Sequence, residues 1–283
     1  MSRSSGLDSF FEKAKERAGK YRWIEAAKLY EQGLATVGEK DFSKLGMIQE
    51  EIGYCIYRAS MQVESREEFE ERTRQAMDAY RKAQEFYESL PDEQKSGRTL
   101  RCGSVCSYLE SWLTSDKSKL NKLLTDCLEM ASKSLAIFSE SEDMLQYGIT
   151  YDALSFYPLT AFFRRVFYER DRQVMKEVVE KGLQWGERAR EVFSEIGDKH
   201  RYASVYLNWI TCFMIYEWFF IAEPEDIDRH DLELMRHLSK LLELSQEIDD
   251  TAVVGMSHFW LAFNTSGDES INHLNKTIET YKK

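Results

Sequence analysis

The sequence contains few residues that interrupt helices. Of its 283 residues only three are proline, at positions 91, 158 and 224. Glu, Lys, Leu, Ala and Arg are abundant, and these residue types favour long helices over strands. Hydrophobic residues make up 43% of the chain, which is ample for a continuous core and excludes a disordered chain. The composition therefore predicts an all-α protein.

Long uncharged apolar runs and a signal-peptide pattern are also missing. The chain opens with the polar residues MSRSSGLDSF. Its five cysteines form no CxxC pair, and the odd number would leave one unpaired in any disulfide scheme. These features predict a protein of a reducing compartment, which we expect to be cytoplasmic.

Positive charge is scarce relative to negative charge. The formal net charge is -11, whereas affinity for nucleic acids and anionic membranes comes largely from Lys and Arg. The most basic neighbourhood, residues 164–181, has acidic residues interleaved. Such mixing is typical of a solvated helix face, and an anion or phosphopeptide contact is the alternative. We expect neither a nucleic acid nor a membrane as partner.

No motif for catalysis or for a cofactor is present. The sequence has no glycine-rich phosphate loop and no HExxH motif, and its acidic run at 223–233 fits no calcium-loop spacing. That run is more simply the first turn of a helix that starts at Pro224, where acidic residues meet the positive end of the helix dipole. Its potential metal ligands are Glu225, Asp226, Asp228, His230 and Asp231. We expect no catalytic, cofactor-binding or metal-binding residue, and therefore not an enzyme.

Isolated histidines and thiols give the same indication. His230 and His237 are seven residues apart, and the other three histidines are scattered along the chain. Cys102 and Cys106 can share one helix face, where small core residues are a simpler interpretation than a reactive or metal-binding pair. None of these residues stands in a recognisable nucleophilic motif.

The segment YRWIEAAKLYEQGL, residues 21–34, is the most informative stretch. Ala26 and Gly33 are small and seven residues apart, and Tyr30 lies between them on the same helical face. This arrangement lets a neighbouring helix lie close, with one ring filling the gap. Ala14 stands twelve residues before Ala26 in the preceding helix.

Together with Leu34, these residues resemble the tetratricopeptide repeat (TPR), a helix-turn-helix unit whose two helices carry small residues where they cross. The resemblance implies an α-solenoid, a superhelix of stacked antiparallel hairpins. The small residue of the first helix recurs as Gly53, Gly103, Ala153, Ala203 and Gly255, at intervals of 50, 50, 50 and 52 residues. The second helices give the pairs Ala26/Gly33, Ala76/Ala83, Cys127/Ser134 and Gly182/Ala189. A period near 50 instead of the usual 34 predicts elongated hairpins.

We therefore predict about six hairpins in a single TPR-like domain, residues 7–283, after a flexible N-terminus at 1–6. Pro158 should kink or split the seventh helix. The last expected helix is not followed by a polar capping helix, so either its apolar face docks on the body or on a second subunit, or the chain is a piece of a longer protein. The expected helices are 8–18, 22–37, 43–63, 66–90, 97–114, 117–139, 142–168, 170–196, 199–221, 225–248, 250–264 and 268–281.

The resemblance also implies where a partner would bind. In TPR proteins the first helices line a concave face, with ligand-facing residues one, four and five positions after the small crossing residue. These offsets predict an aromatic-rich groove for a peptide or a partner helix. Its main residues are Tyr54, Tyr57, Arg58, Tyr108, Tyr157, Asn208, Phe259 and Trp260, and the same offsets also select Ser104, Ser107, Leu154, Ser204, Leu207 and Met256.

Several alternatives remain open from sequence. Some groove residues could pack against an extra helix that fills the concave face. The TPR subtype that grips a C-terminal carboxylate is not expected, because only Arg101 agrees with it and Glu51 would repel the ligand. A regulatory domain that binds a small molecule near Tyr157, Pro158 and Trp209 is the second functional hypothesis. An enzyme with remote site residues is the third, and self-association through the last hairpin is compatible with the first two.

Overall fold

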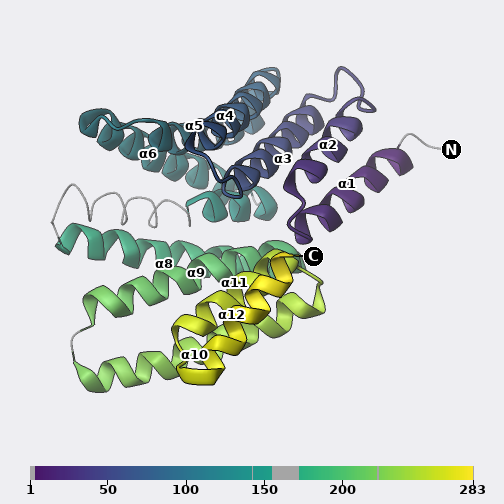
Figure 1. The fold of residues 1–283 in the computed structure, drawn as a ribbon. Helices are drawn as coiled ribbons and strands as arrows, with labels where there is room; N and C mark the ends of the chain where they lie inside the picture. The colour runs from purple at the N-terminus through teal and green to yellow at the C-terminus, as the bar shows by residue number, and fades with distance from the viewer. Residues whose placement is uncertain (1–3, 142, 155–171, 222, 283) are drawn as a thin grey trace. The chain divides into compact units, whose positions relative to one another are not determined.

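The computed structural model describes residues 4–141, 143–154, 172–221 and 223–282. Within these ranges the chain is helical apart from its turns and caps, as the ribbon in Figure 1 shows. The contacts divide it into two compact units. Unit 1 comprises residues up to Ala18 and from Arg22 to Gln146, and unit 2 comprises Gly19–Tyr21 and Tyr147–Lys283. The extent of a single domain over 7–283 stays a prediction.

Unit 1 is built from consecutive antiparallel helices. Each helix from α2 to α5 packs against the helix that follows it, and α2 also contacts α1, where a Cβ atom at Gly33 would lie 3.3 Å from Leu7. The helices are α1 (Ser4–Gly19), α2 (Trp23–Leu34), α3 (Phe42–Ser60), α4 (Arg66–Glu88), α5 (Asp92–Leu113) and α6 (Lys117–Ser141).

Unit 2 continues the same pattern. Residues 144–154 are helical, and the labelled helices pack in sequence as α8 on α9, α9 on α10, α10 on α11 and α11 on α12. These helices are α8 (Arg172–Glu195), α9 (Lys199–Phe220), α10 (Pro224–Glu247), α11 (Thr251–Phe263) and α12 (Gly267–Tyr281). The all-α prediction and the hairpin order are confirmed. Pro158 and the predicted kink lie outside the described residues.

Side-chain caps fix where several helices begin. The carboxylates of Asp41, Asp198 and Asp250 accept hydrogen bonds from backbone N–H groups three residues later, at 3.3, 3.0 and 3.1 Å. Ser65 does the same for α4 at 3.1 Å. Each cap satisfies one of the orphan donors of a helix start. At α10, Pro224 lies in the first turn with Glu225 and Asp226, as the sequence predicted.

Small residues mark the helix crossings in unit 1. A Cβ atom at Gly53 on α3 would lie 2.8 Å from the ring of Tyr80 on α4 and 3.2 Å from the backbone oxygen of Ala76. Gly46 on α3 faces the fully buried Tyr87 in the same way, at 2.4 Å. Because such distances leave no room for a side chain, glycine permits the close approach of these helices.

The same device recurs in unit 2. A Cβ atom at Gly186 on α8 would lie 3.0 Å from Cδ1 of Trp209 on α9, and one at Gly255 on α11 would lie 2.5 Å from Cζ of Tyr281 on α12. Ala203 is fully buried, whereas Ala153 is half-buried. Of the recurring small residues that the sequence predicted, Gly53 and Gly255 therefore lie directly at helix contacts, and Ala203 lies in the core of unit 2.

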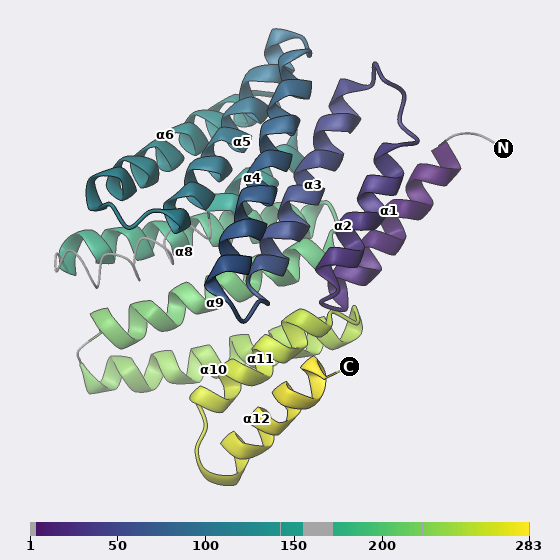
Figure 2. The ribbon, with the colours of Figure 1, turned by 45° about the horizontal axis from the view of Figure 1, so that its top comes forward.

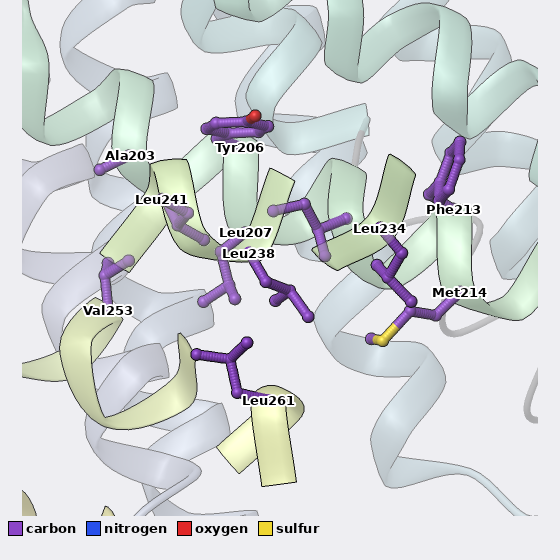
Figure 3. Packing of buried hydrophobic residues seen from close by; sticks show 11 residues of the cluster. Ala203, Tyr206, Leu207, Phe213, Met214, Leu234, Leu238, Leu241, Val253 and Leu261 are labelled. Carbon is purple, nitrogen blue, oxygen red and sulfur yellow. The ribbon is translucent and has the colours of Figure 1, made fainter. Parts of the chain in front are cut away.

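Leucines of α10 organise the core of unit 2. Leu234, Leu238 and Leu241 are fully buried and share one helical face, because they are spaced by four and three residues. They pack against side chains of α9 and α11 (Figure 3), among them Tyr206, Leu207, Ile210, Met214, Val253 and Leu261. This cluster fixes α9 and α11, which present the aromatic residues described below.

None of the described helices combines the length and the apolarity needed to cross a bilayer.

Candidate protein-interaction surfaces

Tyr57 on α3 and Tyr108 on α5 meet directly, although they are 51 residues apart. Their hydroxyl oxygens are 2.9 Å apart, and their rings meet edge to face with centroids 5.9 Å apart. Both side chains are buried, and burial raises the pKa of Tyr57 well above its ordinary value. The two predicted groove residues therefore come together, but most of their area is covered by the helices around them.

Tyr54 and Arg58 lie half-buried on the same helix beside Trp23 of α2. The guanidinium carbon of Arg58 is 5.0 Å from the Trp23 ring centroid and 5.9 Å from that of Tyr54. Nη1 of Arg58 also contacts the Tyr54 hydroxyl at 3.4 Å. The rings hold the cation by its attraction to their faces. A partner that met this cluster would find an apolar surface with one positive charge.

Arg101 is held by acidic and polar groups of unit 1. It is 2% exposed, and its Nε and Nη2 atoms donate to Glu50 at 3.0 and 2.5 Å, while Nη1 donates to Gln146 at 2.6 Å. The Tyr87 hydroxyl donates to the same Glu50 carboxylate at 2.5 Å. Because the Arg101 guanidinium already donates its hydrogen bonds to Glu50 and Gln146, it cannot bind the C-terminal carboxylate of a peptide.

Phe259 and Trp260 belong to a cluster that we call the α9–α11 aromatic patch: Trp218, Phe259, Trp260 and Phe263. Phe259 and Trp260 are half-buried, whereas Phe263 is 60% and Trp218 is 48% exposed. Ring centroids are 5.1 Å apart for Phe259 and Trp260, 4.9 Å for Phe259 and Phe263, and 6.4 Å for Trp218 and Trp260. Exposed clusters of aromatic side chains often mark sites where a protein binds a partner.

Three further predictions concern the middle of unit 2. Asn208 is buried on α9, and Tyr157 lies outside the described residues. Trp209 is surrounded by side chains of its own unit, with the Arg190 guanidinium carbon 4.9 Å and the His237 ring 4.7 Å from its ring centroid. Because Pro158 also lies outside the described residues, a small-molecule pocket at this place stays a hypothesis.

The acidic run at the start of α10 forms no metal centre in the part of the chain that the structure describes. Asp226 pairs with Arg229 at 2.7 Å, as expected for a solvated first turn. Asp231 contacts Glu217 of α9, whose carboxyl is buried. Burial, followed by the hydrogen bond and charge of Asp231, raises the pKa of Glu217 to about 7. A protonated Glu217 lets the two carboxyl groups share a hydrogen bond near neutral pH.

Sequence reasoning missed some of these features. Trp218 and Phe263 were part of a dense aromatic region, but their exposure depends on where α9 and α11 end. The signal available was Phe263, which lies four residues after Phe259 and three after Trp260, in a helix that ends at Phe263 itself. His258 and His273 were scattered in the sequence, yet the structure places their Nδ1 atoms 3.0 Å apart between α11 and α12.

This histidine pair predicts an acid-sensitive hairpin. Burial, followed by the charges of His273 and Lys276, lowers the pKa of His258 to about 4. Burial and the charge of Lys276 also lower the pKa of His273, while the charge of Glu269 acts in the opposite direction. In the unfolded chain His258 has the ordinary histidine pKa of 6.5, so below pH 6.5 the unfolded chain binds a proton that the folded chain does not bind. The folded state therefore loses stability as the pH falls below 6.5. Between pH 7.5 and 5 we expect a loss of about 2 kcal/mol from His258.

Urea unfolding of the wild type and of His258→Asn at both pH values checks this expectation. The variant should lose about 2 kcal/mol less than the wild type on acidification, because its amide does not titrate. Equal losses in the two proteins would contradict the assignment.

No protein-family model and no curated protein sequence matches this chain. One similar solved structure is the crystal structure of nearly identical TPR-like repeats of a putative kinesin light chain from Podosopora anserina. It shares 11% sequence identity with a TM-score of 0.39, over 88% of this chain and 98% of that chain. The hairpin architecture itself is established by the helix packing described above.

Proposed function

We propose that this TPR-like helical array is a non-catalytic, cytoplasmic protein-interaction scaffold. Its partner is a peptide or a helix with apolar side chains, bound on the face of the first helices. The exposed α9–α11 aromatic patch is the observation that supports this proposal most strongly. Two of its four members, Phe259 and Trp260, stand at the positions that line the concave face in TPR proteins.

The chemistry of the patch suits an apolar anchor. Trp and Phe provide large rigid contact areas at low cost in conformational entropy, and they dominate the binding energy of many interfaces. In unit 1, Tyr54 and Arg58 add a second half-buried contact of mixed apolar and positive character. An acidic or neutral residue of a partner would suit that cluster better than a basic one.

The test is to capture partners from a cell extract with the wild type and with the double variant Trp218→Ala/Phe263→Ala. Proteins bound through the patch should be lost or weakened at least tenfold, because truncating an aromatic anchor costs more than about 1.4 kcal/mol of binding free energy. Both side chains are exposed, so the variant keeps its core.

Leu232→Ala on α10 is the matched control, because Leu232 is an exposed apolar residue outside the patch. It should retain every captured protein. Tyr57→Ala/Tyr108→Ala is less informative, since both side chains are buried and their loss would disturb the helix packing. If the double patch variant captures the same proteins at the same yield as the wild type, the patch is not the binding surface.

A further inference from the structure

The last helix exposes a continuous apolar stripe. Three side chains of α12 form it, which we call the α12 seam: Ile271, Leu274 and Ile278, with exposed fractions of 57%, 40% and 50%. A different face of α12 packs on α11, through His273, through Thr277, which hydrogen-bonds to the Gly255 carbonyl, and through Tyr281, whose hydroxyl donates to the Ala252 carbonyl at 3.2 Å. Figure 2 shows α12 beside α11 at the end of the row of helices in unit 2.

The spacing of the seam is that of a helix-pairing surface. Its members are separated by three and four residues, the pattern of successive a, d and a positions in a heptad repeat. Scattered apolar residues on a surface need no explanation, but three aligned on one helix do. Ile at the a positions and Leu at the d position between them provide the branched side chains that fill the holes of a facing helix.

Charge identifies the facing helix. The first turn of α12 carries Asp268 and Glu269, and Lys282 lies at its C-terminal cap. In an antiparallel pair of two identical α12 helices, Asp268 in the acidic turn of one copy lies beside Lys282 of the other, while Leu274 faces Ile278. A parallel pair would instead bring equal charges together. Lys276 lies two positions from both Leu274 and Ile278, at the outer f position of the heptad, so it does not oppose the pairing.

We propose that a second copy of this chain covers the α12 seam, in a two-fold symmetric dimer with the two α12 helices antiparallel. The contact is isologous, since each copy contributes the same residues. A helix of 15 residues is about 22 Å long, so the interface lies at the small end of specific contacts. We therefore expect a dimer with a dissociation constant in the micromolar range, which forms and dissociates with concentration.

Sedimentation equilibrium of the full chain between about 2 and 200 µM tests the dimer. The wild type should change from monomer to dimer over this range, and Leu274→Asp should weaken association at least tenfold, because it places a charge in the seam. Leu232→Asp, at an exposed leucine of α10, should dimerise like the wild type. Circular dichroism of each variant verifies that it is folded.

The orientation is tested by reversing the charges. Asp268→Lys and Lys282→Glu should each weaken the antiparallel dimer, and their combination should restore it. A wild type that stays monomeric at 200 µM would overturn the proposal, as would a Leu274→Asp variant that dimerises normally. Loss of the dimer in Trp218→Ala/Phe263→Ala but not in Leu274→Asp would move the contact to the aromatic patch. The dimer does not depend on the proposed partner binding, so either can fail alone.

Discussion

Arg101→Met should lower the free energy of unfolding of unit 1 by about 3–5 kcal/mol. The guanidinium of Arg101 neutralises Glu50 through two hydrogen bonds and also binds Gln146, and it is almost fully buried. Its removal leaves a carboxylate that is only 12% exposed without its cation. The cost of the variant is therefore the desolvation of Glu50, which the neutral Tyr87 hydroxyl and Cys102 thiol compensate only in part.

Urea unfolding followed by circular dichroism measures this effect, and two variants make it specific. Arg74→Met removes an exposed i, i+4 pair with Glu70 and should change stability by less than about 0.5 kcal/mol. Arg101→Met/Glu50→Met removes both buried charges and should recover a large part of the loss. If Arg101→Met destabilises no more than Arg74→Met, Arg101 is not structural, and its guanidinium would again be a candidate ligand for a carboxylate.

The course of the chain could be predicted from sequence with good accuracy. Apart from the expected helix 142–168, which extends beyond the described residues, helical periodicity and turn residues such as Gly197 and Pro224 placed the helices within about five residues of their observed bounds. The largest difference is at α5, which begins at Asp92, directly after Pro91, and not at residue 97. The crossing residues were also predictable, because only a very small side chain allows two helices to approach closely. Gly53 and Gly255 illustrate this, since ring atoms fill the space where their side chains would be.

The side-chain arrangement could not be predicted to the same depth. The residue that binds Arg101 is Glu50, whereas the sequence comparison drew attention to its neighbour Glu51. Pairs such as Arg101 and Glu50, or Tyr57 and Tyr108, lie 51 residues apart, so they depend on the rotation of each helix about its own axis. A position four or five residues after the small crossing residue lies on a known face of its helix. In hairpins longer than the usual repeat, this position does not determine whether the side chain is exposed.

The exposed surfaces were the hardest to foresee for the same reason. The seam of α12 follows from a heptad spacing that is visible in the sequence, but which face of α12 packs on α11 is decided by Thr277, Tyr281 and the His258–His273 contact. The aromatic patch depends on two helix ends, at Phe220 and Phe263, that lie close only in the folded chain. Local sequence patterns determine where the helices lie, whereas packing between distant residues determines which side chains stay exposed on the surface.

The close approach of paired helices at tiny side chains is the central claim, and Gly53→Val tests it most directly. Valine would place its Cβ against the Tyr80 ring and the Ala76 backbone oxygen, and its two methyl groups beyond them. The gain in helix propensity over glycine is about 0.4 kcal/mol, whereas overpacking costs about 1–3 kcal/mol or more. We expect a net loss of roughly 2–3 kcal/mol in the free energy of unfolding.

Gly38→Val is the matched control, because no atom lies within 4 Å of a Cβ at Gly38. It should leave the free energy of unfolding within about 0.5 kcal/mol of the wild type. Urea unfolding of the two variants side by side gives the decisive comparison. A loss at Gly53→Val that exceeds the Gly38→Val change by roughly 2 kcal/mol or more is the predicted result, and equal stability of the two variants would contradict the account.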